Sequence, residues 1–511
     1  MGLPSVNAAS YISSLSPEMK IEVTVDRGSP LGPSGSAAIR IRQQCVRPHA
    51  TKALPLFYRN IEDALDVRRA AHNFYSISQN SWQTYDHVAD FCSGDILGLA
   101  ASPERRAEFL AEQAAHPDFS LGSTGVRLMD GNYPYLEEAE SQIAAFHGAE
   151  AGLLVSSAFE ANIAVWTAIP RPGDVILYDS LVHASTLEGI KQSLAIQKIE
   201  FPHSDIEAFR SALQDALDTQ PLVRQGKRCV LVALESFYSM DGDVCPLQEF
   251  ISVAKEVFHG QEGNVQFVVD EAHSVGVIGP KGAGLVCELG LQDEIAVVVH
   301  SYGKAMGATG GTLSSSSIWN RTVKSALVNF GRSIIYTTSP SFLFVAAIKS
   351  GYSLLTSGRT LEAQEHIQEL ARHFYESITS HPDWEKAEED GLLSVPLVEG
   401  WEERPFFTHI VTVSTRQKYV WWLYFALLSA GFCTFPVNYP VVPLGQGRLR
   451  IILHASNTHE QVTQFIDATF AWVEEMREIE AGATTEKVSK AAKEFYTWMK
   501  EENLSGYGFA E

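Results

Sequence analysis

The chain has 511 residues, enough for about three domains or for one large enzyme with several lobes. Apolar residues make up 45% and charged residues 20%, which is typical of a globular protein and excludes a largely disordered one. The formal net charge of −22 disfavours broad binding to nucleic acid or to an anionic membrane, because both require a basic surface.

The first 85 residues are predicted to form an N-terminal extension and a helical arm (1–85). Residues 10–33 are rich in Ser, Pro and Gly, which favours loop. Apolar residues at helical spacing in 56–90 predict helices that pack on another part of the molecule. We identify no signal peptide and no apolar stretch long enough for a membrane span, so we expect a cytoplasmic protein.

The six cysteines are widely spaced and include no C-x-x-C pair. This spacing indicates neither a zinc site nor a disulfide framework. We therefore expect reduced thiols and no metal ion, as is usual for a cytoplasmic protein.

Short apolar runs alternate with helical segments from about residue 135, where a helix is predicted over 135–147. Runs this short and apolar suit strands that are buried on both faces of a parallel sheet. They lie at 152–156, 174–178, 229–234, 265–270 and 295–300. The sequence therefore predicts an α/β domain over 86–345, with its ligand site at the carboxyl ends of the strands.

A second, smaller α+β domain is predicted over 346–475. It begins with a long helical stretch and continues with a strand at 406–413, a helix near 419–430 and a strand at 448–453. The last segment, 476–511, is predicted to form a C-terminal helical tail whose helix covers 477–500.

Polar residues follow four of the predicted strands. They are Asp179 and His183, Glu235 and Ser236, Asp270 and His273, and Ser301 and Lys304. Each alone fits an ordinary helix cap, turn residue or solvated side chain. Because the carboxyl ends of parallel strands meet at one edge, we expect the whole set to converge on one crevice.

Segment 301–311 surrounds one lysine, Lys304, with small residues. Small residues let a backbone approach a flat ligand and leave the amine unobstructed. An incidental lysine in a glycine-rich loop is the alternative, but the strand-end residues that accompany Lys304 favour a functional one.

Four segments resemble, in order and spacing, the α-oxoamine synthases: 182–185, 235–243, 270–279 and 301–311. The resemblance extends from about residue 90 to residue 475. These enzymes use pyridoxal 5'-phosphate (PLP) and have fold type I. The resemblance therefore implies a PLP-dependent transferase with a mostly parallel sheet in its large domain and a smaller α+β C-terminal domain.

The resemblance implies roles for residues around the ring of the cofactor. Lys304 matches the Schiff-base lysine, whose neutral amine can also remove the Cα proton of a substrate. Asp270 matches the carboxylate that pairs with the ring nitrogen and strengthens the ring as an electron sink. His183 matches the imidazole on the ring face, and His273 and Ser236 match groups near the ring 3′-oxygen.

The resemblance also implies how the phosphate is held. The backbone N–H groups of Ala158 and Phe159 would meet it at a helix N-terminus, and Ser301 would add a hydroxyl. In the family a further hydroxyl comes from the partner subunit, and Thr337 and Thr338 lie in the matching segment. The resemblance therefore implies a homodimer with shared active sites, although ordinary strand-end threonines are the alternative.

In the second domain Arg450 matches the arginine that binds the carboxylate of the amino acid, whereas Arg448 is expected at the surface. The chain departs from the family at four positions. Gly94 replaces an asparagine that helps to hold the carboxylate, Thr312 replaces an aromatic residue, Ala158 replaces a glycine, and Asn438 replaces an arginine that some members use for a carboxylated acyl chain. These departures leave the PLP-binding residues intact and concern the substrate.

We therefore expect a decarboxylative condensation of glycine, alanine or serine with an acyl thioester, giving an α-aminoketone. The thioester is a CoA ester or a chain on an acyl carrier protein, and a polyketide or fatty acyl chain fits better than a chain ending in an acid. Two alternatives stay open: another fold type I enzyme such as an aminotransferase, and a non-catalytic partner subunit. The second would lack the lysine, which this chain has.

Overall fold

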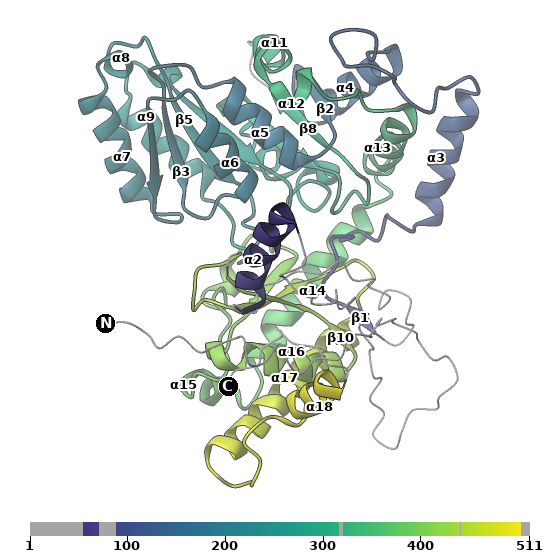
Figure 1. Cartoon of the computed structure of the whole chain (residues 1–511), viewed down its shortest axis with the longest axis vertical. Helices are drawn as coiled ribbons and strands as arrows, with labels where there is room; N and C mark the ends of the chain where they lie inside the picture. The colour runs from purple at the N-terminus through teal and green to yellow at the C-terminus, as the bar shows by residue number, and fades with distance from the viewer. Residues whose placement is uncertain (1–54, 71–87, 316–319, 440, 502–511) are drawn as a thin grey trace.

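The computed structural model describes residues 55–70, 88–315, 320–439 and 441–501. Two lobes are stacked along the long axis of the molecule (Figure 1). The large lobe holds a seven-stranded sheet and the small lobe a three-stranded sheet. Helix α14 (Leu361–Thr379) leads from the large lobe into the small one (Figure 1).

The sheet of the large lobe has the strand order β2-β8-β7-β6-β5-β3-β4. Strand β8 is antiparallel to both of its neighbours, and the other pairs are parallel. The strands are β2 (Ala151–Val155), β3 (Val175–Asp179), β4 (Gln197–Phe201), β5 (Val230–Glu235), β6 (Val265–Asp270), β7 (Ile295–Ser301) and β8 (Gly311–Ser315). The predicted α/β class with a mostly parallel sheet is therefore confirmed.

Alternate residues of the central strands pack into cores on opposite faces of the sheet. In β5, Val230, Val232 and Leu234 join the core that contains α7 (Ile206–Thr219) and α9 (Leu247–Val257). Leu231 and Ala233 join the core that contains α5 (Ala158–Ala168). Every residue of β5 is buried, as expected for a strand that is covered on both faces.

Helices cover both faces of this sheet (Figure 1). The helices of the large lobe are α3 (Pro103–Ala115), α4 (Pro134–Phe146), α5 (Ala158–Ala168), α6 (Ala184–Gln192), α7 (Ile206–Thr219), α8 (Pro221–Arg224), α9 (Leu247–Val257), α10 (Leu285–Glu288), α11 (Asn320–Phe330), α12 (Arg332–Ile335) and α13 (Phe342–Thr356). Helices α5 and α6 each begin directly after a short loop that follows a strand, so their N-termini lie at the carboxyl edge of the sheet.

The small lobe has an antiparallel sheet with the order β11-β12-β9. Its elements are β9 (Ile410–Val413), β11 (Phe435–Val437), β12 (Arg448–Ile452), α14, α15 (Trp384–Glu389), α16 (Val420–Ser429) and α17 (His459–Glu480). The short strand β1 (Ala89–Asp90) pairs in parallel with β10 (Phe432–Cys433). The chain near residue 90 therefore packs on the small lobe before it enters the large one.

The structure differs from the predicted domain limits at two points. The limit at 345/346 falls inside α13, which packs on α3 and α4 of the large lobe. The limit at 475/476 falls inside α17. We propose that the large lobe continues to the end of α13, and that the tail begins after α17.

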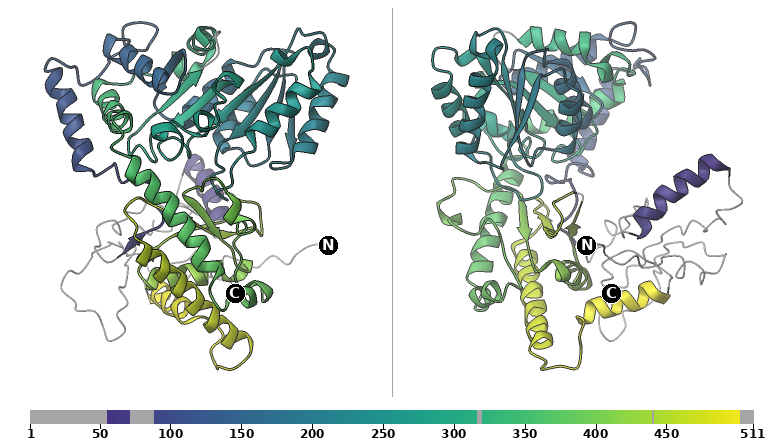
Figure 2. Two further views of the ribbon diagram at one scale, coloured as in Figure 1. Left: turned by 180° about the vertical axis from the view of Figure 1, so that it is seen from behind. Right: turned by 60° about the vertical axis from the view of Figure 1, so that its left-hand side comes forward.

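The predicted terminal helix at 477–500 is in fact two segments, the end of α17 and a separate helix α18 (Lys490–Glu501). Helix α18 packs on α16: Phe495 stacks on Phe425 at 4.6 Å, and Trp422 Nε1 donates to the Tyr496 hydroxyl at 3.0 Å. The turn between α17 and α18 is visible at the lower end of the small lobe (Figure 2).

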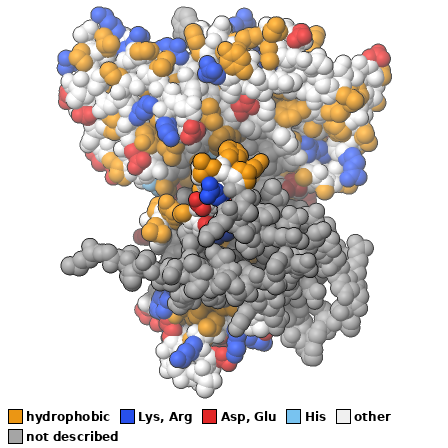
Figure 3. Space-filling view, viewed as in Figure 1, with side chains coloured by type: hydrophobic (Ala, Val, Ile, Leu, Met, Phe, Trp, Pro, Cys, Tyr) orange, Lys and Arg blue, Asp and Glu red, His pale blue; other side chains and the backbone are white. Residues whose placement is uncertain are grey.

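Helix α2 (Leu56–Ala70) is the described part of the predicted N-terminal arm, and it stands away from both lobes (Figure 2). Several of its apolar side chains are exposed, including Phe57 at 68% and Val67 at 69%. They form an apolar patch at the level where the two lobes meet (Figure 3). None of the helices in the described ranges is long and apolar enough to cross a membrane.

Candidate active site

Lys304 lies in a closed loop directly after β7. The Tyr302 N–H donates to the Gly310 carbonyl at 2.9 Å, and the Gly307 N–H donates to the Lys304 carbonyl at 2.7 Å. Gly310 adopts a φ of 123°, which favours glycine. Burial lowers the pKa of the Lys304 amine and the charge of Arg450 lowers it further, against the opposing carboxylate of Asp270. The loop therefore holds a desolvated amine, which is the form that a nucleophile or base requires.

A cavity of about 390 Å³ opens at the carboxyl ends of the parallel strands. Its size is in the range of small-molecule sites. The four predicted catalytic residues all line it: His183, Asp270, His273 and Lys304. Three of the predicted phosphate-binding residues line it as well: Ala158, Phe159 and Ser301. The convergence expected from the strand order is therefore present in the folded chain.

Asp270 ends β6, and two donors fix the orientation of its buried carboxylate. Asn162 Nδ2 donates to Oδ2 at 2.7 Å, and the Ala272 N–H donates to Oδ1 at 2.8 Å. Asn162 Nδ2 also donates to Ser185 Oγ at 3.0 Å, and Ser185 Oγ lies 2.6 Å from His183 Nδ1. Asn162 and Ser185 thus connect the carboxylate to the imidazole across the cavity wall. Ser185 lies in the segment 182–185 that resembles the family, and Asn162 lies one turn into the helix predicted at the phosphate, but the sequence assigned neither a role.

His183 is the N-cap residue of α6, where its Nδ1 accepts from the Ser185 N–H at 3.3 Å. Burial lowers the pKa of the imidazole, although the Asp270 carboxylate raises it. The ring that faces the cavity is therefore neutral near pH 7. Phe159 meets it edge-on, with ring centroids 6.3 Å apart.

Helix α5 begins at the cavity. Ser157 caps it by accepting from the Glu160 N–H at 3.1 Å, and the unpaired N–H groups of the first turn make a helix N-terminus a site for anions. Gly311 permits the close approach of α5 to β8, since a Cβ there would lie 2.6 Å from the Ala158 nitrogen. Ala158 itself needs no positive φ, so its departure from glycine costs no backbone strain.

Ser236 is not brought to the cavity, which corrects its predicted role. Its side chain is fully buried, donates to the Asp270 carbonyl at 3.2 Å and lies 2.8 Å from Ser274 Oγ. Its neighbour Glu235 and the later Ser239 line the cavity instead. The motif 235–243 was correctly identified, but the sequence alone did not say which of its serines faces inward.

Glu235 is a cavity residue that sequence reasoning did not assign. Its Oε1 has no hydrogen-bond partner among the described residues. Burial raises the pKa of Glu235 well above its ordinary value, and the neighbouring Asp270 raises it further. The protonated form of Glu235 is therefore favoured more than in an exposed glutamate, at a strand end that pairs in register with Asp270.

Thr337 and Thr338 follow α12 and do not line the cavity of their own chain. Thr338 is exposed and forms an isolated antiparallel bridge with Val126. Their contribution to a partner's site stays a prediction.

Arg450 reaches the cavity wall from the small lobe. Its Nη1 donates to the Ser239 carbonyl at 3.3 Å, while its Nε has no hydrogen-bond partner in the described part of the chain. Burial lowers the pKa of Arg450. Arg448 is half-buried rather than at the surface, because alternate residues of β12 share a face and Arg448 forms an ion pair with Asp241.

The loop 239–243 joins the two lobes beside the cavity. Thr408 Oγ1 donates to the Gly242 carbonyl at 2.7 Å, and Thr412 Oγ1 donates to the Met240 carbonyl at 2.9 Å. From the large lobe, His203 lies 2.9 Å from Asp243 Oδ2. Although burial lowers the pKa of His203, its hydrogen bonds to two carboxylates raise it to about 10. These hydrogen bonds hold the loop 239–243 between the two lobes and so fix the position of the small lobe beside the cavity.

A protein-family comparison matches residues 86–468 to the family described as aminotransferase class I and II. The chain belongs to this family. An aminoacyl transferase from Aspergillus fumigatus is 47% identical over 89% of this chain and 96% of its own length. An 8-amino-7-oxononanoate synthase from Emericella nidulans is 40% identical over 77% and 91%.

Solved structures give the same family and fold. A serine palmitoyltransferase from S. paucimobilis, solved with PLP and myriocin bound, superposes with a TM-score of 0.61 at 26% identity and covers 76% of this chain and 88% of its own. The predicted membership of the α-oxoamine synthases and the predicted fold type I are confirmed.

Two of the departures from the family pattern contact the lysine loop, residues 301–311. A Cβ at Gly94 would be 3.5 Å from the Gly303 carbonyl oxygen and 3.7 Å from Lys304 Cγ, which is ordinary contact. The backbone therefore does not require glycine at this position. Thr312 Oγ1 forms a hydrogen bond with the hydroxyl of Tyr302, at the base of the lysine loop.

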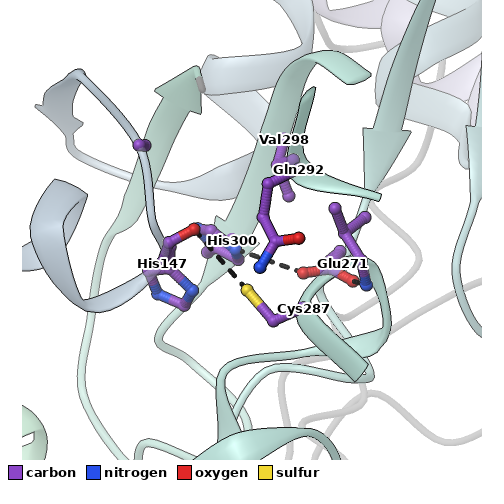
Figure 4. A pocket seen from close by; sticks show the side chains of 8 residues that line it. His147, Glu271, Cys287, Gln292, Val298 and His300 are labelled. Atoms are coloured by element: carbon purple, nitrogen blue, oxygen red, sulfur yellow. Dashed lines mark hydrogen bonds and ion pairs between the residues drawn. The ribbon is translucent and has the colours of Figure 1, made fainter. Parts of the chain in front are cut away.

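Behind the same strand ends lies a rear cluster of three buried and two half-buried polar side chains: His147, Glu271 and His300, and Cys287 and Gln292 (Figure 4). The His147 and His300 rings stack with centroids 3.9 Å apart, and His300 Nε2 lies 3.3 Å from Glu271 Oε2. His147 is bonded at both nitrogens, to the Ala283 carbonyl at 3.0 Å and to the Tyr352 hydroxyl at 2.7 Å. The cavity between these side chains is about 10 Å³, no more than one water molecule needs.

Proposed function

We propose that the cavity binds PLP and that the protein condenses a small amino acid with an acyl thioester, with loss of CO₂. The observation that carries this proposal is the convergence of Lys304, Asp270 and His183 with the N-terminus of α5 on one cavity. These groups fit the cofactor: an amine for its aldehyde, an anion for its ring nitrogen, a flat neutral ring for its face and N–H donors for its phosphate.

The relatives support the reaction class. They are named as an aminoacyl transferase and an 8-amino-7-oxononanoate synthase, and the structural neighbour is a serine palmitoyltransferase with PLP bound. The predictions of a PLP-dependent acyltransferase, and of PLP as its cofactor, are confirmed at this level. We propose glycine, alanine or serine as the amino acid. We propose CoA or a carrier protein as the carrier of the acyl group.

PLP, when bound, supplies an electron sink for the carbanion that forms at the Cα of the amino acid. Lys304 holds an amine whose pKa is lowered by burial, which favours the neutral form that can take the Cα proton. Asp270, fixed by Asn162 of α5, offers an anion on the wall of the cavity. His183 covers one wall with a neutral ring. The chain thus places a base, an anion and a flat surface around one space.

Arg450 is proposed to bind the carboxylate of the amino acid. It is the guanidinium that reaches the wall of the cavity, through Ser239, and it forms no ion pair with a described carboxylate. A guanidinium fork matches a carboxylate with two parallel hydrogen bonds. Binding in this way would orient the Cα–H and Cα–carboxylate bonds relative to Lys304.

We also propose that two copies of the chain share their active sites. Thr337 and Thr338 lie outside the cavity of their own chain, and the side chains of Leu128, Met129 and Tyr336 near them are exposed at 51%, 81% and 70%. An apolar surface of this kind is typical of an interface. Mixing Lys304→Ala with Thr337→Ala/Thr338→Ala protein tests the idea: shared sites predict regained activity, whereas separate sites predict none.

The experiment that tests the function is a reaction survey with purified protein and PLP. Each of glycine, L-alanine and L-serine is mixed with acyl-CoA esters of several lengths and with acyl carrier protein esters, and CO₂ and the aminoketone are measured. The proposal expects both products in equal amounts from one pairing. Amino transfer to a 2-oxo acid without thioester, or the absence of any PLP absorbance change with amino acids, would contradict it.

A further inference from the structure

Several buried nitrogen atoms lack a hydrogen-bond partner where the two lobes meet. Among the described residues these are Nδ1 of His273, Nδ1 and Nε2 of His409, and Nε of Arg450. His409 is fully buried immediately before β9 in the small lobe, and its ring centroid lies 5.7 Å from that of His273 in the large lobe, with the planes 21° apart. Side chains from both lobes therefore bring unsatisfied nitrogens to one place.

An ordinary structural histidine in the same lobe looks different. His454 is 2% exposed, but its Nδ1 lies 2.9 Å from the Asp90 carbonyl oxygen and its Nε2 lies 3.1 Å from the Ser93 hydroxyl. A buried polar group without a partner costs free energy that a bonded one does not. His409 has both ring nitrogens in this costly state, which is unexpected for a residue that only fills space.

The surroundings of His409 carry positive charge and N–H donors. Burial, followed by the charges of His454, Lys304 and Arg450, lowers the pKa of His409 to about 3. Burial likewise lowers the pKa of His273, followed by Lys304, His409 and Arg450. No described carboxylate is among the groups that shift either imidazole. Gly94, which lies against Lys304, has no side chain to contribute.

A buried guanidinium beside two neutral imidazoles, without an acidic partner in the described chain, is an arrangement that an anion would complete. This group of side chains adjoins the cavity. His273 lines the cavity, and so does Ser239, whose carbonyl accepts a hydrogen bond from Arg450. A carboxylate is the anion that fits, since it can accept from the guanidinium and from an imidazole N–H together.

We propose that His409 is a substrate-binding residue that donates a hydrogen bond to the amino-acid carboxylate held by Arg450, with His273 closing the same site from the large lobe. This rests on the role proposed above for Arg450. It gives the small lobe two contacts with the substrate carboxylate, one from β12 and one from the residue before β9.

The first experiment uses the full chain as purified and sodium formate as the probe. Formate is a carboxylate without an amine, so its binding needs no catalysis, and it is detected as a rise in melting temperature. The wild type is expected to be stabilised by formate more than by sodium chloride at the same ionic strength. His409→Leu is expected to lose this difference and, without formate, to melt at a higher temperature than the wild type, because two unsatisfied nitrogens are removed.

Two further variants keep this test decisive. His409→Gln retains an N–H donor and is expected to keep part of the formate effect. His373→Phe changes a half-buried histidine on α14, away from the cavity, and is expected to keep all of it. A formate effect that persists in full in His409→Leu, or one absent from the wild type, would overturn the inference.

The second experiment titrates the PLP-loaded protein with glycine, L-alanine and L-serine, and with ethylamine, which has no carboxylate. His409→Leu is expected to raise the dissociation constant of the amino acid about tenfold to a hundredfold, the usual effect of one hydrogen bond to a charged group. The constant for ethylamine is expected to stay unchanged. Equal weakening of both ligands would refute a carboxylate contact. A wild type that binds formate but not amino acids would contradict the proposed function instead.

Discussion

Two groups of buried histidines lie on opposite sides of the ends of β6 and β7, and they differ in how their nitrogens are satisfied. In the rear cluster His147 is bonded at both nitrogens, and His300 faces Glu271 through Nε2 while its Nδ1 has no partner among the described residues (Figure 4). In the front pair His273 likewise lacks a partner at Nδ1, but neither ring nitrogen of His409 has one. All four rings are buried, so burial does not separate a structural histidine from a functional one. The feature that sets His409 apart is that both of its ring nitrogens lack a hydrogen bond.

A chain of hydrogen bonds leads from the rear cluster to the lysine loop. When His147 Nδ1 donates to the Ala283 carbonyl, its neutral Nε2 accepts from the Tyr352 hydroxyl. The Tyr352 hydroxyl lies 3.1 Å from the Tyr302 hydroxyl, which forms a hydrogen bond with Thr312 Oγ1. The chain ends at the base of the lysine loop. The rear cluster thus supports Lys304, whereas the front side offers open donors to a ligand.

The largest expected effect is the loss of activity when Lys304 in the active-site cavity is replaced. Lys304→Ala removes both the nucleophile and the base, so product formation should fall by about a thousandfold or more. The melting temperature should not fall, because a desolvated amine is lost. Lys191→Ala, on the exposed face of α6, is the matched control and should keep full activity. Turnover by Lys304→Ala near the wild-type rate would contradict the assignment.

The next-largest effect is expected in the rear cluster, where a substitution should lower stability rather than substrate binding. His147→Ala removes two hydrogen bonds and leaves a space beside His300, so the free energy of unfolding should fall by about 2–4 kcal/mol. Denaturant unfolding measures this loss. KM for the amino acid should stay unchanged in the fraction that remains folded. A raised KM at unchanged stability would mean that the rear cluster also contacts substrate.

A smaller effect is expected for Asn162, which connects Asp270 to Ser185 and His183 in the cavity wall. Asn162→Ala removes the hydrogen bond to Asp270 Oδ2, so kcat should fall about tenfold, as for other residues that orient a functional group. The absorbance pH titration of bound PLP should shift as well, which a purely structural change would not cause. Unchanged kcat and an unchanged titration would show that Asp270 needs no such support.

The rear cluster should also affect stability through pH. Burial raises the pKa of Glu271 from its ordinary 4.5 to about 7 in the folded chain. A raised pKa means that the folded state binds the proton more tightly, so this stabilisation is full below about pH 4.5 and is lost as the pH rises through 7. Glu271→Gln should remove that slope and melt at a higher temperature than the wild type at pH 8. Melting curves from pH 5 to 8 measure it, and equal slopes would refute it.

The smallest effect is expected at Thr312. Thr312→Val keeps the shape of the side chain but removes the hydroxyl that bonds Tyr302. The free energy of unfolding should therefore fall by about 1 kcal/mol and kcat by less than about threefold. Thermal melting and initial rates measure the two. A larger loss of kcat than of stability would place Thr312 in direct control of the lysine loop.

The central sheet could be predicted because its signal is local. β5 and β6 are continuous apolar runs, and runs of that kind identify strands buried on both faces. Two strands were missed for physical reasons. β4 lies at the edge of the sheet, so only part of it is buried, and β8 is built from Gly, Thr, Leu and Ser without an apolar run.

Only those site residues that come directly after a predicted strand could be placed from the sequence. Asp270 and Lys304 lie directly after predicted strands, so their meeting could be expected before the fold was known. Ser236 and Ser239 share one motif, and only the turn of the chain decides which faces the cavity. The approach of His409 to His273 joins two lobes across 136 residues, and no local pattern records it.

The measurement that tests the account most directly is the identity of the lysine that holds PLP. The protein is saturated with PLP, reduced with sodium borohydride to make the attachment permanent, digested, and its peptides are identified by mass spectrometry. The account predicts the added mass on the peptide that contains Lys304, with retention of unreacted lysines elsewhere. Attachment at a different lysine, or no attachment at all, would contradict it.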